Sequence, residues 1–167
     1  MTETGKKEIK LIVSEIDGVI TDGKCAEDEL GNVLYKVFQN KDFAALNEIK
    51  KSFKFVFMSD DNRVSYNLCR RRNIPFYWAR SEQEKYSTLI EIMRRYECTP
   101  DEVLYIGSKI SDVKCCRLIP KSFCPDDAGQ YLKEVCWASF LSAGGRGILV
   151  ELLYLLKIES KNSRIFE

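Results

Sequence analysis

The sequence of 167 residues contains no histidine. A Ser-His-Asp or Cys-His catalytic system is therefore excluded, as are zinc and haem sites that depend on histidine ligands. Any proton transfer near neutral pH has to use a carboxylate, a lysine, a tyrosine, a cysteine or water. Candidate catalytic residues are thus restricted to these groups.

The sequence also lacks a charge excess and a long apolar run. Lys and Arg together number 26 and Asp and Glu together number 25, which gives a net charge of +1 and argues against a dedicated nucleic-acid-binding protein. No apolar segment approaches the roughly 20 residues that a membrane span needs, and the polar N-terminal segment is not followed by a signal-peptide core. We expect no nucleic-acid partner, no membrane partner and a cytoplasmic location.

The seven cysteines lack the spacing of a metal site or a disulfide framework. Their number is odd, and no two of them form a C-x-x-C pair. We therefore expect free thiols buried in a protein of a reducing cytosol. A reactive thiol at the adjacent Cys115 and Cys116 is the alternative. The full set is Cys25, Cys69, Cys98, Cys115, Cys116, Cys124 and Cys136.

Short apolar runs alternate with helical stretches along the chain. Apolar residues make up 45% and charged residues 31% of the sequence, which is the composition of a globular protein. The apolar runs predict strands over 10–14, 55–59, 76–78, 103–106, 122–124 and 137–140. The helical periodicity predicts helices over 42–51, 63–72, 82–96, 112–118 and 147–156.

This alternation favours an α/β fold, a three-layer doubly wound parallel sheet with helices on both faces. Residues 24–38 interrupt the alternation with a pattern of strand, turn and strand, which predicts a β-hairpin inserted after the first strand. We expect one domain over 1–167 with no large cap, a core over 8–157 and a polar tail over 158–167. The tail frays unless Ile165 and Phe166 dock on a neighbouring chain.

Polar residues follow several predicted strands. Glu15 and Asp17 follow the first strand, Ser59 ends the second, Lys85 opens the long helix after the third, and Gly107–Asp112 follows the fourth. In an open α/β sheet the functional site lies outside the carboxyl ends of the strands. The order of these residues therefore predicts one site at this edge.

The ordered set resembles the motifs of the haloacid dehalogenase (HAD) superfamily. The hairpin after the first motif and Gly144-Gly145-Arg146-Gly147 near the C-terminus make the chain similar to the 3-deoxy-D-manno-octulosonate 8-phosphate phosphatase family. That family includes phosphatases of related nine-carbon sugar acids. It also includes the C-terminal domain of animal CMP-sialic acid synthetases, which lacks part of the catalytic set. The resemblance covers about residues 8–157.

The resemblance implies an aspartyl-phosphate mechanism. The first carboxylate of a D-x-D motif attacks phosphorus and holds Mg²⁺, and the second protonates the leaving sugar and later activates water. Glu15 stands at the first position, and Asp17 matches the second as general acid and base and as a metal ligand. Ser59 and Lys85 match the phosphate-binding residues, with Lys85 also in the catalytic set. Asp112 matches the last acid of the metal loop.

The resemblance also implies substrate contacts and partners. Lys41 matches the basic residue that follows the hairpin, and Arg146 matches an arginine that points toward a substrate site at a subunit boundary. Members of the family form tetramers, in which hairpins and tails of neighbouring chains cover each site. A homo-oligomer is therefore expected, with an acylneuraminate or octulosonate cytidylyltransferase as a possible partner.

Several residues depart from the family pattern. Glu15 replaces the nucleophilic aspartate, Ser108 and Lys109 replace two acids of the metal loop, and Asp60 and Asp61 replace a common Gly-Arg. The two loop changes make the loop +3 more positive. An ammonium about 5 Å from Mg²⁺ would be repelled by roughly 6 kcal/mol at an effective dielectric near 20. A shift of about 1 Å at a nucleophile can lower the rate on the order of a hundredfold.

These departures predict a HAD homologue of the sugar-acid phosphatases with impaired or lost phosphatase chemistry. It would be retained for oligomer assembly or ligand binding in 3-deoxy-ulosonic (octulosonic or sialic) acid metabolism. Lys109 could then pair with Glu15 and Asp17, without a cation. The alternative is an active Mg²⁺-dependent phosphatase with Glu15 in the nucleophile position. A third interpretation is an oligomerisation module that docks on a nucleotidyltransferase.

Overall fold

The central element of the fold is a six-stranded parallel sheet. The computed structural model describes residues 7–61 and 63–165, with side chains up to Glu159. The strand order is β5 (Phe76–Trp78), β4 (Lys54–Ser59), β1 (Leu11–Ser14), β6 (Val103–Ile106), β7 (Lys121–Cys124) and β8 (Ala138–Ser139). The predicted fold class is confirmed, and each predicted strand lies within two residues of the observed one.

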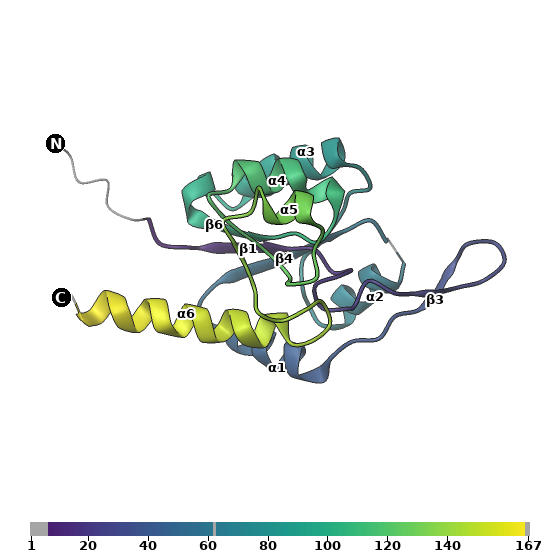
Figure 1. The fold of residues 1–167 in the computed structure, drawn as a ribbon, viewed down its shortest axis with the longest axis horizontal. Helices are drawn as coiled ribbons and strands as arrows, with labels where there is room; N and C mark the ends of the chain where they lie inside the picture. The colour runs from purple at the N-terminus through teal and green to yellow at the C-terminus, as the bar shows by residue number, and fades with distance from the viewer. Residues whose placement is uncertain (1–6, 62, 166–167) are drawn as a thin grey trace.

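Helices cover both faces of the sheet (Figure 1). One face carries α3 (Glu82–Arg95), α4 (Val113–Leu118) and the short α5 (Gln130–Lys133), while α1 (Asn40–Ile49), α2 (Val64–Arg71) and α6 (Ile148–Ile165) pack on the other. The side chains of β1 alternate between the two apolar layers, with Ile12 in one and Leu11 and Val13 in the other. A parallel strand buried on both faces needs such a continuous apolar run.

The predicted hairpin extends from the body of the domain, as Figure 1 shows. It consists of β2 (Ala26–Glu27) and β3 (Val33–Tyr35), joined by a turn in which Gly31 has a φ of +79°. Leu30 is 82% exposed and Val37 73% exposed, so the arm presents apolar side chains to solvent in this chain.

The C-terminal segment differs from the prediction. Helix α6 continues to Ile165, whereas we expected a helix that ends at Leu156 and a frayed tail over 158–167. Lys157, Ile158 and Glu159 are compatible with a helix that the apolar residues before them have already nucleated. Polarity alone therefore does not end a helix. The expected docking of Phe166 lies outside the described residues.

Two glycines bring the C-terminal Gly-Gly-Arg-Gly motif against the loop after β1. A Cβ atom on Gly144 would lie 2.2 Å from the carbonyl oxygen of Gly18, which leaves no room for a side chain. Gly18 itself has a φ of +81°, a conformation that favours glycine. The amide of Gly145 donates a hydrogen bond of 2.9 Å to the carbonyl of Val19. These contacts fix the loop that carries Asp17.

Candidate functional site

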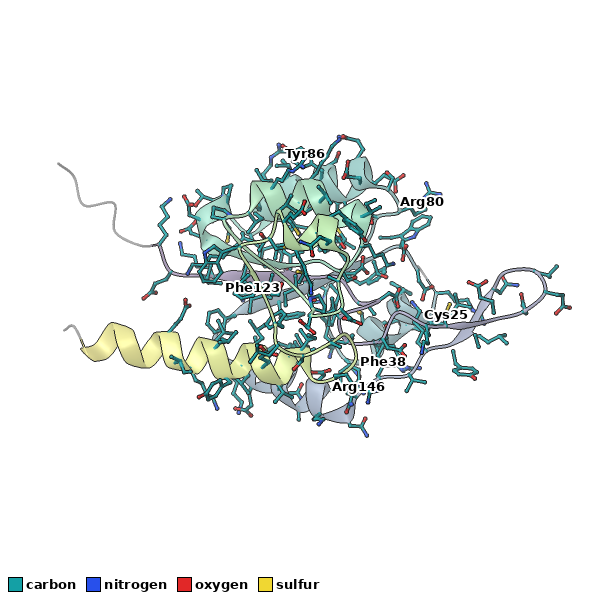
Figure 2. All side chains as sticks on the ribbon, in the orientation of Figure 1. Cys25, Phe38, Arg80, Tyr86, Phe123 and Arg146 are labelled. Carbon is teal, nitrogen blue, oxygen red and sulfur yellow. The ribbon has the colours of Figure 1, made fainter. Side chains whose placement is uncertain are left out.

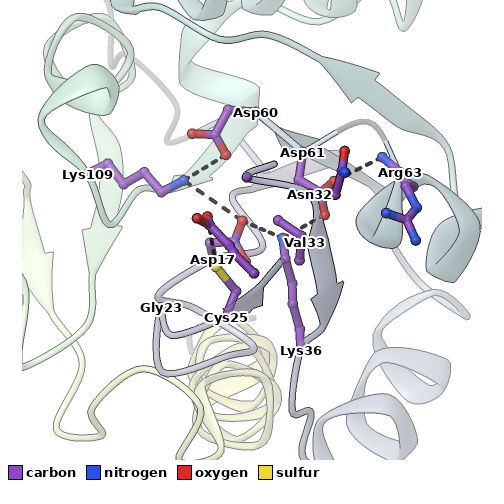
Figure 3. A pocket seen from close by; sticks show the side chains of 12 residues that line it. Asp17, Gly23, Cys25, Asn32, Val33, Lys36, Asp60, Asp61, Arg63 and Lys109 are labelled. Atoms are coloured by element: carbon purple, nitrogen blue, oxygen red, sulfur yellow. Dashed lines mark hydrogen bonds and ion pairs between the residues drawn. The ribbon is translucent and has the colours of Figure 1, made fainter. Parts of the chain in front are cut away.

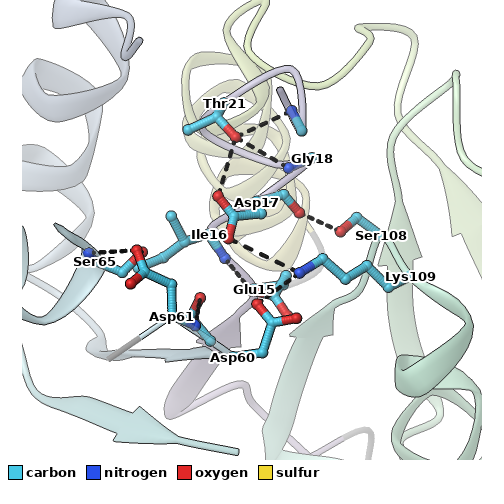
Figure 4. A network of polar contacts seen from close by, with 12 residues as sticks. Glu15, Ile16, Asp17, Gly18, Thr21, Asp60, Asp61, Ser65, Ser108 and Lys109 are labelled. Carbon is cyan, nitrogen blue, oxygen red and sulfur yellow. Dashed lines mark hydrogen bonds and ion pairs between the residues drawn. The ribbon is translucent and has the colours of Figure 1, made fainter. Parts of the chain in front are cut away.

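The loops after β1, β4 and β6 meet at the carboxyl edge of the sheet, and their polar side chains converge there (Figure 4). Register explains the convergence, because Ser14, the last residue of β1, pairs with Phe57 of β4 and with Ile106 of β6. The residues that follow these strands therefore emerge side by side. The convergence predicted from the strand ends is present, and it divides into a buried part and an open part.

The buried part, here called the inner cluster, consists of Glu15, Lys85, Tyr105 and Asp112. The ammonium of Lys85 forms ion pairs with Glu15 and, at 2.8 Å, with Oδ1 of Asp112. The hydroxyl of Tyr105 donates to the same Asp112 oxygen at 2.7 Å. All four side chains are fully buried. One lysine thus neutralises one of two carboxylates in a space without solvent.

The two carboxyl groups of the inner cluster have opposite pKa shifts. Burial raises the pKa of Glu15, and the neighbouring Lys85 counters this effect only in part. Burial acts in the same direction on Asp112, but Lys85, the Tyr105 hydroxyl and a backbone amide together lower its pKa. Glu15 accepts fewer hydrogen bonds than Asp112, which accounts for the difference.

The open part, here called the outer cluster, consists of Asp17, Lys36, Asp60, Asp61 and Lys109. The ammonium of Lys36 lies 2.8 Å from Oδ2 of Asp17 and 2.8 Å from Oδ2 of Asp61. The ammonium of Lys109 lies 2.8 Å from Oδ1 of Asp60 and 3.9 Å from Oδ2 of Asp17. Asp17 therefore faces two ammonium groups, as Figure 3 shows.

A cavity of about 450 Å³ lies over the outer cluster. Figure 3 shows that its walls come from the hairpin and from the loops after β1, β4 and β6. The described residues that line it include the whole outer cluster but not Glu15, Lys85 or Asp112. The lining residues are Asp17, Gly23, Cys25, Glu27, Gly31, Asn32, Val33, Lys36, Asp60, Asp61, Arg63 and Lys109.

Three further predicted site residues, beyond those of the inner cluster, also lie apart from this cavity. Ser59 is buried, and its hydroxyl accepts a 3.4 Å hydrogen bond from the amide of Asp61. Lys41 and Arg146 are exposed and do not line the cavity; Figure 2 shows Arg146 near the start of α6. Their roles as substrate contacts stay predictions. Asp42 points inward instead, and its Oδ1 accepts from the amide of Leu149 at 2.9 Å, at the start of α6.

Sequence reasoning did not predict Lys36, Asp60 or Asp61 as residues of the site. A lysine in a short polar hairpin is typical of a solvent-exposed side chain, yet the side chain of Lys36 is only 2% exposed. The expected pairing of Lys109 with Asp17 is present, but its shorter contact is with Asp60, while Glu15 pairs with Lys85. The substitution of Gly-Arg by two aspartates was the one available clue.

The resemblance implies a magnesium ion at this edge of the sheet. The acidic residues there match a magnesium site only in the spacing of their carboxylate oxygens. Carboxylate oxygens of Glu15, Asp17 and Asp60 lie within 4.8 Å of one another, the spacing of a metal site. However, Lys109 points into this group. The Ser108 hydroxyl donates to the carbonyl of Asp17 at 2.5 Å rather than facing the acids. Magnesium requires a nearly octahedral shell of oxygens, so this donor set does not suit it while Lys109 stays in place.

The chain is similar in sequence and structure to known phosphatases. No protein-family model matches the chain. The 3-deoxy-D-manno-octulosonate 8-phosphate phosphatase of Haemophilus influenzae is 22% identical over 163 residues, which covers 96% of this chain and 89% of that protein. Sequence similarity thus extends over both proteins almost completely.

Solved structures show the same fold. The cobalt-bound form of the Haemophilus influenzae phosphatase has a TM-score of 0.84 at 22% identity, over 96% of this chain and 94% of that one. The Moraxella catarrhalis phosphatase, in complex with magnesium, phosphate and 3-deoxy-D-manno-octulosonate, has a TM-score of 0.82 at 19% identity, over 95% and 91% of the two chains.

The sheet order, the hairpin and the acidic loops at the strand ends therefore define a HAD-type α/β fold. Over almost its whole length the chain is similar in sequence and fold to 3-deoxy-D-manno-octulosonate 8-phosphate phosphatases, so the resemblance predicted from its motifs is confirmed.

Among the described residues, no helix is both long enough and apolar enough to cross a membrane.

Proposed function

We propose that this chain is a relative of the sugar-acid phosphate phosphatases in which phosphatase chemistry is impaired or lost. It would be retained for ligand binding or oligomer assembly in the metabolism of 3-deoxy-ulosonic acids. The observation that carries this proposal is the state of Glu15, which holds the position of the nucleophile. Its carboxylate is fully buried, and the cavity above it is lined by other residues.

Both carboxylate oxygens of Glu15 are engaged by the protein itself. Oε1 accepts the amide hydrogen of Ile16 at 2.9 Å, and Oε2 pairs with Lys85. A nucleophile has to approach the reacting atom within about 3–3.5 Å and along a defined direction. Glu15 cannot reach the cavity without leaving these partners, which supports a loss of nucleophilic attack.

Asp17 has the position of the general acid and base, and it is also engaged. Its Oδ2 faces the ammonium groups of Lys36 and Lys109, at 2.8 and 3.9 Å. Its Oδ1 accepts the hydroxyl of Thr21 at 3.5 Å. A general acid needs one oxygen within hydrogen-bond reach of the leaving group. Asp17 lines the cavity and could contact a ligand, but proton transfer would require it to exchange these partners first.

One observation favours the alternative, an active Mg²⁺-dependent phosphatase of 3-deoxy-D-manno-octulosonate 8-phosphate or acylneuraminate 9-phosphate. The carboxylates of Glu15, Asp17 and Asp60 are close enough to surround a cation. Outward rotation of Lys109, whose side chain is 32% exposed, would leave these three acids facing one another. In that case Asp60 would be an additional ligand, and Glu15 would bind metal or attack phosphorus.

Release of inorganic phosphate from these two sugar phosphates, with and without Mg²⁺, separates the two functions. We expect no turnover above the reaction without protein. The matched control for Asp17→Asn is Asp22→Asn, whose carboxylate lies on the same loop outside both clusters. Turnover that Mg²⁺ stimulates and that Asp17→Asn abolishes would establish the active phosphatase and refute the proposal. Restoring aspartate at Glu15, Ser108 and Lys109 should raise activity if the remaining scaffold is intact.

The hairpin supports the proposed role in assembly. Its apolar side chains Leu30, Leu34, Tyr35 and Val37 are all more than half exposed in the single chain. Burial of such side chains between subunits would be favourable at roughly 25 cal/mol for each Å² of apolar surface. We propose a homo-oligomer, with a tetramer and a cytidylyltransferase partner as the specific expectations, in the cytoplasm. A strict monomer in light scattering would refute the assembly role.

A further inference from the structure

The outer cluster contains two matched ion pairs that come from different parts of the chain. Asp60 and Asp61 are neighbours in the loop after β4, and each holds one lysine. Lys109 arrives from the loop after β6, and Lys36 arrives from the base of the hairpin. Both ammonium groups also approach the same oxygen of Asp17, as Figure 3 shows.

We propose that Lys109 and Lys36 together replace the divalent cation of the related phosphatases, with Asp60 and Asp61 as their counter-charges. This inference rests on the proposed function, and it accounts together for three of the departures, Lys109, Asp60 and Asp61. A change from an acid to Lys109 in the metal loop adds positive charge, and the change of glycine to Asp60 removes one unit of it. The two residues then meet at 2.8 Å.

The contacts of Lys36 make the hairpin part of this arrangement. Its ammonium contacts Asp17 and Asp61 and also the hydroxyl of Ser65, at 3.1 Å. Its side chain is almost completely buried. Burial opposes the charge of Lys36, but the two aspartates outweigh it and raise its pKa. Lys36 therefore links the hairpin to the loops after β1 and β4 by ion pairs, and to the start of α2 by a hydrogen bond.

Each of the three acids that have the spacing of a metal site already pairs with a lysine. Oδ2 of Asp17 faces both lysines, Oδ1 of Asp60 pairs with Lys109, and Oε2 of Glu15 pairs with Lys85. Burial opposes the charge of Lys109 as well, yet Glu15, Asp60 and Asp17 raise its pKa. A cation at this place would have to displace a charged lysine that the same acids stabilise.

Titration of the protein with Mn²⁺, followed by the loss of the free-ion EPR signal, tests the replacement. We expect no stoichiometric uptake by the wild type at micromolar Mn²⁺. The Lys109→Met variant, whose unbranched side chain is one atom shorter and carries no charge, should bind Mn²⁺ at least tenfold more tightly. Lys114→Met is the matched control, because this lysine on α4 pairs with Glu82 outside the cluster, and it should behave as the wild type.

Two results would overturn the inference. Uptake of one Mn²⁺ by the wild type would show that the lysines do not replace the cation, and this result stands even if the variant fails to fold. A folded Lys109→Met variant that binds no better than wild type would show that Lys109 is not what excludes the ion. Mn²⁺ uptake without phosphate release contradicts this inference alone, whereas metal-independent phosphatase activity contradicts the proposed function alone.

Limited proteolysis tests the contribution of Lys36. Chymotrypsin has candidate sites at Leu30, Leu34 and Tyr35 on the hairpin. Lys36→Met should increase the rate of cleavage there severalfold, while Lys24→Met, at a lysine 88% exposed on the same hairpin, should leave it unchanged. Equal cleavage rates for wild type and both variants would show that Lys36 does not hold the hairpin.

Discussion

The inner and outer clusters occupy the same edge of the sheet, yet they differ in exposure to water. In the inner cluster, Lys85 is enclosed by Glu15 and Asp112, and all three are fully buried. In the outer cluster the pair of Lys109 and Asp60 is partly open, with side chains that are 32% and 39% exposed, whereas Lys36, Asp17 and Asp61 are exposed by 2%, 12% and 12%. A charged group that is shielded from water is stabilised only by its protein partners. A partly exposed charged group can exchange a protein partner for water.

The difference in exposure between the clusters agrees with the positions at which the sequence departs from the family pattern. Lys85 and Asp112 retain the residue types of the family, and each has contacts on several sides that a substitution would break. Most departures lie in the outer cluster or its loop: Ser108, Lys109, Asp60 and Asp61. The exception is Glu15, which is one methylene longer than aspartate and still reaches Lys85. The inner cluster holds the loops together, and the outer cluster lines the cavity.

The largest expected effect is that of Lys85→Met. It leaves Glu15 and Asp112 as unpaired buried carboxylates, so we expect a loss of about 3–5 kcal/mol in the free energy of unfolding. Lys109→Met breaks a partly exposed pair and should cost less than about 1 kcal/mol. Urea unfolding at pH 7 measures both. Equal losses for the two variants would remove the distinction between the clusters.

Tyr105→Phe should have an intermediate effect. The hydroxyl of Tyr105 is buried and donates to Oδ1 of Asp112 at 2.7 Å. Its removal leaves that oxygen with Lys85 alone, at a cost of about 1–3 kcal/mol in the free energy of unfolding. Tyr154→Phe, at an exposed tyrosine of α6, is the control and should leave stability unchanged. A loss no greater than in this control would show that the hydrogen bond contributes nothing.

Asp61→Asn should change the dependence of stability on pH, with the change of slope confined to acid. Burial opposes ionisation of Asp61, but Lys36 and two backbone amides lower its pKa to about 2. Because the folded state binds its proton less readily than the unfolded state, stability from this carboxylate is present above about pH 4 and is lost as the pH falls toward 2. Asp61→Asn should flatten this part of the profile by no more than about 2 kcal/mol, since one pKa unit corresponds to about 1.4 kcal/mol.

The measurement is the free energy of unfolding between pH 2 and 5, with Asp22→Asn as an exposed control. An unchanged slope in Asp61→Asn would indicate that the pair with Lys36 does not contribute to acid stability. Glu15 should act in the opposite direction, because burial raises its pKa. Its contribution is therefore present below its ordinary pKa and is lost as the pH rises through the raised pKa.

Most of the fold could be predicted from the order of residues alone. The apolar runs of β1, β4 and β6 are long enough to identify buried parallel strands, and the strand ends placed Glu15, Asp17, Ser59, Lys85 and Asp112 at one edge. Periodicity reports burial along one element, which is local information. The predicted end of α6 at Leu156 was wrong. The polar residues that follow Leu156 are compatible with a helix, and no glycine or proline among them ends it.

The partners of the charged residues depended on contacts between distant segments. Lys36 and Asp61 lie 25 residues apart, and Lys109 and Asp60 lie 49 apart, so no local pattern joins them. Composition and order along the chain predicted an α/β fold, its functional edge and the residue types there, and the resemblance of the motifs added the HAD type. Which carboxylate meets which ammonium is a property of packing, because burial of Lys36 and enclosure of Glu15 arise only when the hairpin and the three loops come together.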